Sequence, residues 1–300
     1  MIPLAPNKNT VNNYKTNLLN YINKRRAGSS EISSINTVLN SIEQNLTLDD
    51  LIVADYGKLL SLKRKYTKYF KTLTDIEKKD RIKSLSIFLT YYKEFSALYG
   101  PTLMKELKIE VCPYCNRNYI FNAGDRRTSE FDHFIPKSPY KIFAISFFNL
   151  IPVCHTCNHI KSNQISKLLS PYDSSLTINT FKFIPIMQTV NKYDIELRET
   201  NKKDKKAALN LNNKLRLKEL YSHHSYIAED LYMKSQIYQP QYLQKLKQVF
   251  FNTPSIMSPT ESDFKRFILT TYGDDNDLYI YPLSKATKDI AEYFGLYQKL

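Results

Sequence analysis

Apolar side chains recur every three or four residues through much of the first hundred positions, the spacing of an amphipathic helix. The segment 11–26 predicts the first helix, ended by Ala27-Gly28-Ser29-Ser30, and a second helix is expected over about 31–45. The apolar face of the first predicted helix comprises Val11, Tyr14, Leu18, Leu19 and Ile22.

Helix start signals follow. Thr47 can cap exposed backbone N–H groups of a third helical segment, and Asp50 suits its first turn. The tetrad Thr74-Asp-Ile-Glu77 has the pattern of a capping box. We expect the long helix that it starts to end at Gly100-Pro101, a typical stop signal.

Residues 112–170 interrupt this helical pattern with short β-like runs and several prolines. Two strands are expected next, over 180–186 and 192–199, as a hairpin with a longer loop. Helices should return from about Lys205 through Leu246. A polar loop near 252–260, a helix over 262–272, an acidic turn at 274–277 and a last helix from Ser284 complete the expected order.

Taken together, the pattern predicts a mostly helical α+β protein in three parts. These are a helical N-terminal region over 1–105, a central module over 106–172, and a C-terminal region over 173–300 with short strands and then helices. The chain carries a net charge of +14, and its middle segment is the most basic per residue. This charge favours a polyanionic partner, nucleic acid before membrane.

No apolar run approaches the roughly 18 residues that cross a bilayer, and the first residues contain no apolar signal segment. We therefore expect a cytoplasmic protein. All four cysteines fall into two Cys-x-x-Cys pairs, Cys112/Cys115 and Cys154/Cys157. Four thiolates complete a tetrahedral zinc site and leave no position open, so the expected role is structural. Reduced thiols or a redox pair are the alternative.

Polar residues suited to chemistry lie within and just beyond this frame. Asp132 and His133 are adjacent, Asn149 follows sixteen residues after His133, and Asn158 comes directly after the last cysteine. The runs C-P-Y-C, D-H-F-I-P-K-S and N-L-I-P-V-C-H-T-C-N-H-I-K resemble the HNH endonuclease family. The resemblance implies a ββα-metal module, in which a two-stranded hairpin and a helix clasp one divalent cation.

The same resemblance implies a role for each residue. Asp132 and Asn158 would be oxygen ligands of Mg²⁺ or Mn²⁺. His133, on the opposite strand face, would be the general base that takes a proton from water. Asn149 would orient His133 or brace its loop. The alternative for each residue taken singly is structural. Asp132 and His133 would be an ordinary strand pair, Asn149 a turn residue and Asn158 a helix cap.

Basic residues near this segment could contact phosphate, with surface solvation as the alternative for each: Lys137, Lys161, Arg117, Arg126 and Arg127. His155 and His159 flank the second cysteine pair without a fixed job. A further basic run with interleaved aromatics lies at 63–71, where a solvated helix face over core aromatics competes with nucleic-acid contacts.

The tail motifs Ser170-Pro-Tyr-Asp173 and Tyr281-Pro-Leu-Ser-Lys285, with Asp289-Ile290, are similar to those of stand-alone bacterial HNH proteins. That subgroup includes nucleases paired with an ABC-like ATPase in Septu-type and retron-linked anti-phage defence. The sequence therefore predicts an HNH endonuclease that cuts DNA, or RNA, and the resemblance of the tail motifs implies control by such an ATPase. The competing class is a non-catalytic zinc module that binds nucleic acid or a protein.

Overall fold

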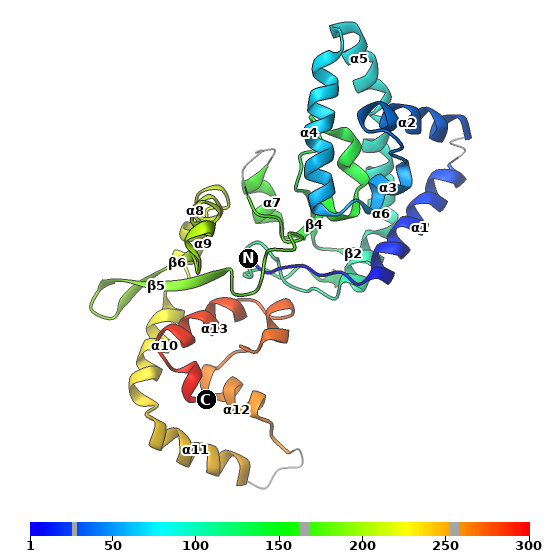
Figure 1. Cartoon of the computed structure of the whole chain (residues 1–300). Helices are drawn as coiled ribbons and strands as arrows, with labels where there is room; N and C mark the ends of the chain where they lie inside the picture. The colour runs from blue at the N-terminus through cyan, green and yellow to red at the C-terminus, as the bar shows by residue number, and fades with distance from the viewer. Residues whose placement is uncertain (26–28, 163–167, 253–257) are drawn as a thin grey trace.

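A computed structural model describes residues 1–25, 29–162, 168–252 and 258–300 (Figure 1). The predicted helix stop at Ala27 and Gly28, and much of the predicted polar loop near 252–260, lie outside the described residues. Helices from the first third of the chain gather at one end of the molecule and those of the last third at the other. Small two-stranded sheets lie between them, so the predicted mostly helical α+β class is confirmed.

The N-terminal region contains α1 (Lys8–Lys24), α2 (Ser29–Ile42), α3 (Leu48–Val53), α4 (Tyr56–Thr72), α5 (Asp75–Ser84) and α6 (Ile87–Leu107). Local sequence explains where several of these helices begin. Thr47 and Asp50 form a capping box at α3, and Thr74 and Glu77 form one at α5. In α1 the predicted apolar face is buried at Tyr14, Leu18 and Ile22.

The predicted long helix ending at Gly100-Pro101 is wrong in both respects. The helix started by Thr74 ends at Ser84, and α6 then runs through Gly100 and Pro101 to Leu107. Buried side chains lie on α6 before and after the proline, including Phe95 and Leu103, and their packing offsets the lost helical hydrogen bond.

Gly100 has a different role from a helix stop. A Cβ at this position would lie 2.7 Å from a guanidinium nitrogen of Arg127 and 3.5 Å from the ring of Phe131. The missing side chain therefore lets Arg127 lie directly against α6. The helix finally ends where Lys108 adopts a left-handed conformation, with φ of 52°.

The central segment contains two antiparallel hairpin-like pairs and one helix. Strands β1 (Asn122–Ala123) and β2 (Arg126–Arg127) pair, as do β3 (Glu130–His133) and β4 (Leu150–Val153). Between β3 and β4 lie the short 3₁₀ helices η1 (Lys141–Ile145) and η2 (Phe147–Asn149), and α7 (His155–Lys161) follows β4. The strand–strand–helix order matches the predicted ββα module.

The C-terminal region opens with the predicted hairpin, β5 (Phe181–Thr189) and β6 (Lys192–Glu199). Its turn is shorter than expected, because Thr189 pairs with Lys192 and Asn191 takes a positive φ of 59°. The following elements are η3 (Lys202–Asp204), α8 (Lys205–Lys214), α9 (Leu217–Ser222), α10 (Tyr226–Ile237), α11 (Pro240–Asn252), α12 (Glu261–Leu269), η4 (Asp275–Tyr279), α13 (Ser284–Tyr293) and η5 (Tyr297–Lys299). Among the described residues, no helix is both long and apolar enough to cross a membrane.

The first cysteine pair is a meeting point for distant parts of the chain. The Ile2 N–H donates to the carbonyl of Pro113, which brings the first residues of the chain onto this turn. From the other end, the Lys285 N–H donates to the buried side chain of Asn116 at 2.8 Å. The Tyr221 hydroxyl donates at 2.7 Å to the carbonyl of the cysteine before Asn116. Both flanks are thus tied to the turn between the predicted zinc ligands.

Candidate functional site

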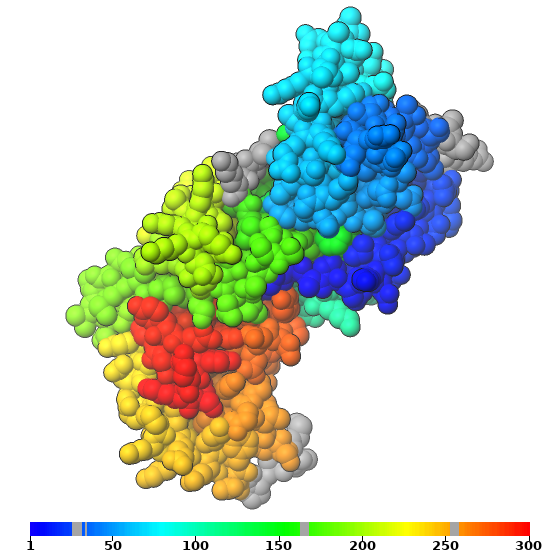
Figure 2. All heavy atoms as spheres, viewed as in Figure 1, coloured from blue at the N-terminus to red at the C-terminus, as the bar shows by residue number. Residues whose placement is uncertain are grey.

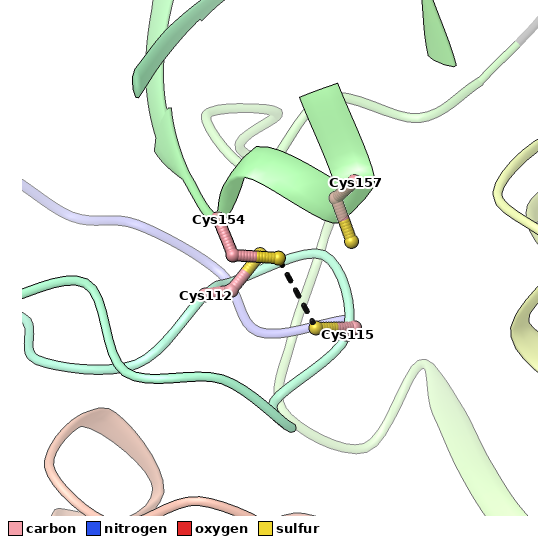
Figure 3. Close-up of side chains that lie close together, drawn as sticks. All are labelled: Cys112, Cys115, Cys154 and Cys157. Atoms are coloured by element: carbon pink, nitrogen blue, oxygen red, sulfur yellow. Dashed lines mark hydrogen bonds between the residues drawn. The ribbon is translucent and has the colours of Figure 1, made fainter. Parts of the chain in front are cut away.

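The four cysteines converge at a single point, as the close-up in Figure 3 shows. Cys112 and Cys115 come from the turn before β1, and Cys154 and Cys157 come from the start of α7. All four sulfur atoms lie within 4.8 Å of one another and all four residues are buried, with Cys115 and Cys154 sulfurs 3.9 Å apart.

These distances fit a structural zinc ion. Tetrahedral Zn–S bonds of about 2.3 Å place neighbouring sulfurs roughly 3.8 Å apart. N–H groups also point at the sulfurs: the Arg117 backbone donates to Cys115, and the Asn118 side chain donates to Cys154, each at 3.4 Å. Such donors stabilise thiolates. The predicted four-cysteine zinc site is therefore supported by the residue types and their arrangement.

Asp132 lies in the core of the module, on the β3 face that meets α7. One carboxylate oxygen accepts a hydrogen bond from the Lys161 ammonium at 2.9 Å, and the other accepts one from the Tyr114 hydroxyl at 2.7 Å. The Lys161 ammonium also donates to the carbonyl of His133 at 3.2 Å. Both Asp132 and Lys161 are almost completely buried, so this is an ion pair shielded from water.

His133 contacts different groups from its neighbour Asp132. Its Nε2 lies 3.0 Å from the carbonyl of Ala144 in η1. Because a carbonyl can only accept, Nε2 carries the proton and Nδ1 keeps a free lone pair. Burial lowers the pKa of His133 to about 3, with the nearby Lys137 and Lys161 charges contributing. The imidazole is therefore neutral at neutral pH.

A helix outside the module covers His133. The Tyr92 ring, from α6, lies edge-to-face on the imidazole with 4.3 Å between ring centroids. Its hydroxyl donates to the Phe131 carbonyl at 3.3 Å. The Lys137 ammonium lies 4.5 Å from the centre of the same Tyr92 ring, and burial lowers the pKa of Lys137. The sequence carried no signal for Tyr92, which is forty-one residues away along the chain.

Asn149 fixes the loop that connects β3 to η1. Its side-chain oxygen accepts from the Ile135 N–H at 2.6 Å, and its amide nitrogen donates to the carbonyls of Ile135 and Phe143 at 3.1 and 2.9 Å. Asn149 is fully buried, and Phe143 directly precedes Ala144, the hydrogen-bond partner of His133. Of the two tasks expected for Asn149, these contacts correspond to bracing the loop.

Asn158 lies beside Glu130. Glu130 was not among the candidate site residues predicted from the sequence. The Asn158 amide donates to one Glu130 carboxylate oxygen at 2.5 Å, and the His155 ring nitrogen lies 2.9 Å from the other. Partial burial alone would raise the pKa of Glu130, but the hydrogen bonds from His155 and Asn158 lower it on balance. Strand alternation could have pointed to this residue, because Glu130 is two positions before Asp132 and shares its strand face.

The basic residues predicted to touch phosphate do not form one group. Arg127 lies over the Phe131 ring at 4.3 Å, and burial lowers its pKa. Arg117 donates to His224 at 3.0 Å, on the side of the cysteine cluster, whereas Arg126 is exposed on β2. Lys161 is buried against Asp132, so a phosphate contact by Lys161 would require that ion pair to open.

One comparison with known proteins found a match, and it covers the central segment. A family model described as HNH endonuclease matches residues 112–167. That match, together with the four-cysteine cluster, implies metal-dependent nuclease activity on nucleic acid in general terms. No curated protein and no solved structure matches the chain.

The residues near β3 have the chemistry for a hard divalent cation. Glu130, Asp132 and Asn158 offer carboxylate and amide oxygens, the donors that Mg²⁺ and Mn²⁺ prefer. The Asp132 carboxylate is already paired with one cation, the Lys161 ammonium. A cation bound to Asp132 would compete with the Lys161 ammonium for this carboxylate. Glu130 and Asn158 are partly exposed and therefore easier for a cation to reach.

Proposed function

We propose that this protein is a metal-dependent endonuclease that hydrolyses phosphodiester bonds, with DNA as the favoured substrate and RNA as the alternative. The observation that carries the proposal is the state of His133. Its Nε2 proton is committed to the Ala144 carbonyl, which leaves Nδ1 free as a proton acceptor, inside a ββα segment that matches HNH endonucleases.

In this proposal His133 acts as general base. Nδ1 would take a proton from the water that attacks phosphorus, a contribution of roughly 10²–10⁴ in rate for a base whose pKa lies near the working pH. This role requires bound phosphate and water to raise the pKa of His133 from about 3 toward neutrality. Asn149 supports the step indirectly, since it holds the loop that presents the Ala144 carbonyl. The Tyr92 ring covers one side of the imidazole, so it would limit the access of water to His133.

Asp132 and Asn158 are the proposed ligands of the catalytic cation, and Glu130 lies close enough to Asn158 to assist. A divalent cation held there would neutralise charge on the phosphate and on the leaving oxygen. Lys161 would then be released from Asp132 and would leave a basic side chain near the substrate. Mg²⁺ and Mn²⁺ are both compatible with these oxygen donors.

The observation that favours a non-catalytic module is the burial at Asp132. Both of its oxygens already have partners, and its ion pair with Lys161 would have to break before any metal could bind. A protein that only used the zinc frame to bind nucleic acid would keep this ion pair permanently.

Plasmid DNA and transfer RNA, each incubated with Mg²⁺ or Mn²⁺, separate these possibilities. We expect the wild type to cut DNA, chelation to stop the reaction, and His133→Ala to lower the rate by about 10² or more. Cleavage of RNA alone would replace DNA as the substrate. No metal-dependent cleavage of either nucleic acid would favour the binding module.

We also propose a cytoplasmic role in anti-phage defence under the control of an ABC-like ATPase, on the resemblance of the two tail motifs. In the structure, Lys285 and Asp289 form a buried ion pair, and Asp289 accepts the Phe183 N–H at 3.0 Å. These two residues therefore serve the fold rather than a docking face. Co-purification of an ATPase with the tagged protein from its native host would support the defence role.

A further inference from the structure

Helix α4 carries an unusual concentration of positive charge. Its seventeen residues include six Lys or Arg and no Asp or Glu. Glu43, on the neighbouring segment, pairs with Lys58 and Lys65 and offsets part of this charge. The helix and the following α5 project from the body of the molecule (Figure 1).

Three of these cations form a stripe along one side of α4. Arg64, Lys68 and Lys71 are spaced by four and three residues, so they share a helix face over about 10 Å. All three are exposed, and among the described residues none of their side chains forms a hydrogen bond or an ion pair. We call these residues the α4 stripe.

The aromatic residues of α4 do not share this exposure. Tyr66 is 4% exposed and stacks on Phe70 with 4.2 Å between ring centroids. Of the two interpretations of the run at 63–71, aromatic side chains in the core and cations in solvent therefore describe α4. A base-stacking platform would need Tyr66 at the surface.

Helix α4 is fixed directly to the loop that follows His133. The Tyr56 ring packs edge-to-face on Phe134 at 5.4 Å, and Phe134 is the residue after His133. Further along, the Lys63 ammonium lies 5.2 Å from the centre of the Tyr140 ring. In Figure 2 the light-blue atoms of α4 lie beside the green atoms of the central module. At about 100° per residue the α4 stripe lies on a different side of α4 from Tyr56 and Lys63, so it is connected to the loop after His133 through the helix itself.

We propose that the α4 stripe binds the phosphate backbone of double-stranded DNA that extends beyond the cleavage site. This inference rests on the proposed nuclease function. An exposed, projecting helix can lie in or along the wide major groove of B-DNA, whereas the deep, narrow major groove of duplex RNA excludes it. Contacts of this kind give affinity and position without reading sequence.

Salt dependence of DNA binding tests the proposal. A duplex of about 30 base pairs is titrated with the His133→Ala protein over a range of KCl concentrations, with and without R64Q/K68Q/K71Q. Log K falls with log salt, and each phosphate contact contributes about 0.9 to the steepness of that fall. The slope of the triple variant should therefore be less steep by about 2–3. The single variant Lys68→Gln should make the slope less steep by about 0.9.

The matched control removes three exposed lysines of α8 instead, K205Q/K206Q/K214Q, with the same change in net charge. Its slope should equal that of the parent protein. An unchanged slope in R64Q/K68Q/K71Q, or an equal loss in both triple variants, overturns the proposal. A loss seen with duplex RNA but not with DNA overturns it as well. Failure of the nuclease proposal is recognised separately, by His133→Ala cutting at the wild-type rate.

Discussion

At the scale of single residues, Asn149 connects loop geometry to the proposed chemistry. Three hydrogen bonds from one buried amide hold the segment between Ile135 and Phe143, and the next residue supplies the carbonyl that binds His133. A substitution at Asn149 should therefore affect His133 through this loop, although Asn149 does not contact His133 directly. Such a substitution distinguishes a loop that supports catalysis from a loop that only stabilises the fold.

We predict that Asn149→Ala lowers the free energy of unfolding by about 1–3 kcal/mol, because it leaves buried backbone groups without partners. The cleavage rate should fall by more than this loss of folded protein explains. Asn212 of α8 provides the matched control, since it is also buried and bonds the N–H and carbonyl of Leu197 in β6, outside the loop that contacts His133. Equal losses of cleavage in Asn149→Ala and Asn212→Ala would contradict a special role for Asn149.

The sequence predicted the residue types near β3 better than their contacts. Adjacent Asp132 and His133 indicated two strand faces, and the structure gives them separate partners. The proximity of Glu130 to Asn158 depends on how α7 packs on β3, and the cover over His133 depends on Tyr92 from α6. Neither follows from local spacing, because both need the tertiary arrangement.

At the scale of elements, the capping boxes show where local chemistry decides a helix boundary. The box predicted at Thr74 is present, and α5 has no buried side chain to stabilise it otherwise. The stop predicted at Gly100 failed because the buried face of α6 extends past the proline. Exposed helices follow their local signals, whereas packing overrides those signals in buried ones.

For α5 we predict a dependence on both residue 74 and pH. Thr74→Ala should speed amide exchange in the first turns of α5 by about fivefold relative to wild type. Backbone and side-chain hydrogen bonds from Thr74 lower the pKa of Glu77 below its usual 4.5. The stabilisation is therefore complete above that value and is lost as pH falls through the lower, folded-state pKa.

Protection factors for α5, corrected for intrinsic exchange and compared at about pH 7 and about pH 3, check this prediction. The capping box of α12, formed by Thr260 and Asp263, should respond to acid in the same direction because the pKa of Asp263 is also lowered. Protection in α5 that stays constant over this range, or that survives Thr74→Ala, would show that packing rather than the cap holds the helix.

At the scale of the whole molecule, the four-cysteine cluster joins regions that are far apart in sequence. The turn at 112–116 receives hydrogen bonds from Ile2, Tyr221 and Lys285. The proposed division at 105 and 172 therefore describes how the elements follow one another, while these bonds tie both flanks to the centre. A zinc ion at the cluster would stabilise the flanks through them.

We predict that Cys157→Ser lowers the bound zinc from one ion per chain and destabilises helices on both sides of the module. Structural zinc sites contribute roughly 10–16 kcal/mol in isolated zinc-finger peptides, so the loss should exceed that of an ordinary core substitution. Metal analysis and thermal unfolding followed by circular dichroism measure both effects. Thr156→Ser, between the last two cysteines, is the control and should retain zinc.

Unfolding of the module alone, with the remaining helices unaffected, would contradict the inference that the cysteine cluster stabilises the flanks. That link was not predictable from the cysteine spacing. The two Cys-x-x-Cys pairs indicate a metal site, but Asn116 and Tyr221 reach their partners across more than a hundred residues of chain.

We propose that His133 is the general base of a nuclease. The most direct test of this proposal is the rate of plasmid cleavage with Mn²⁺ by His133→Ala and by His223→Ala, an exposed histidine far along the chain, at equal zinc content. We predict that the rate falls by a factor of about 10² or more in the first variant and stays at the wild-type value in the second. Equal rates in His133→Ala and wild type would contradict it.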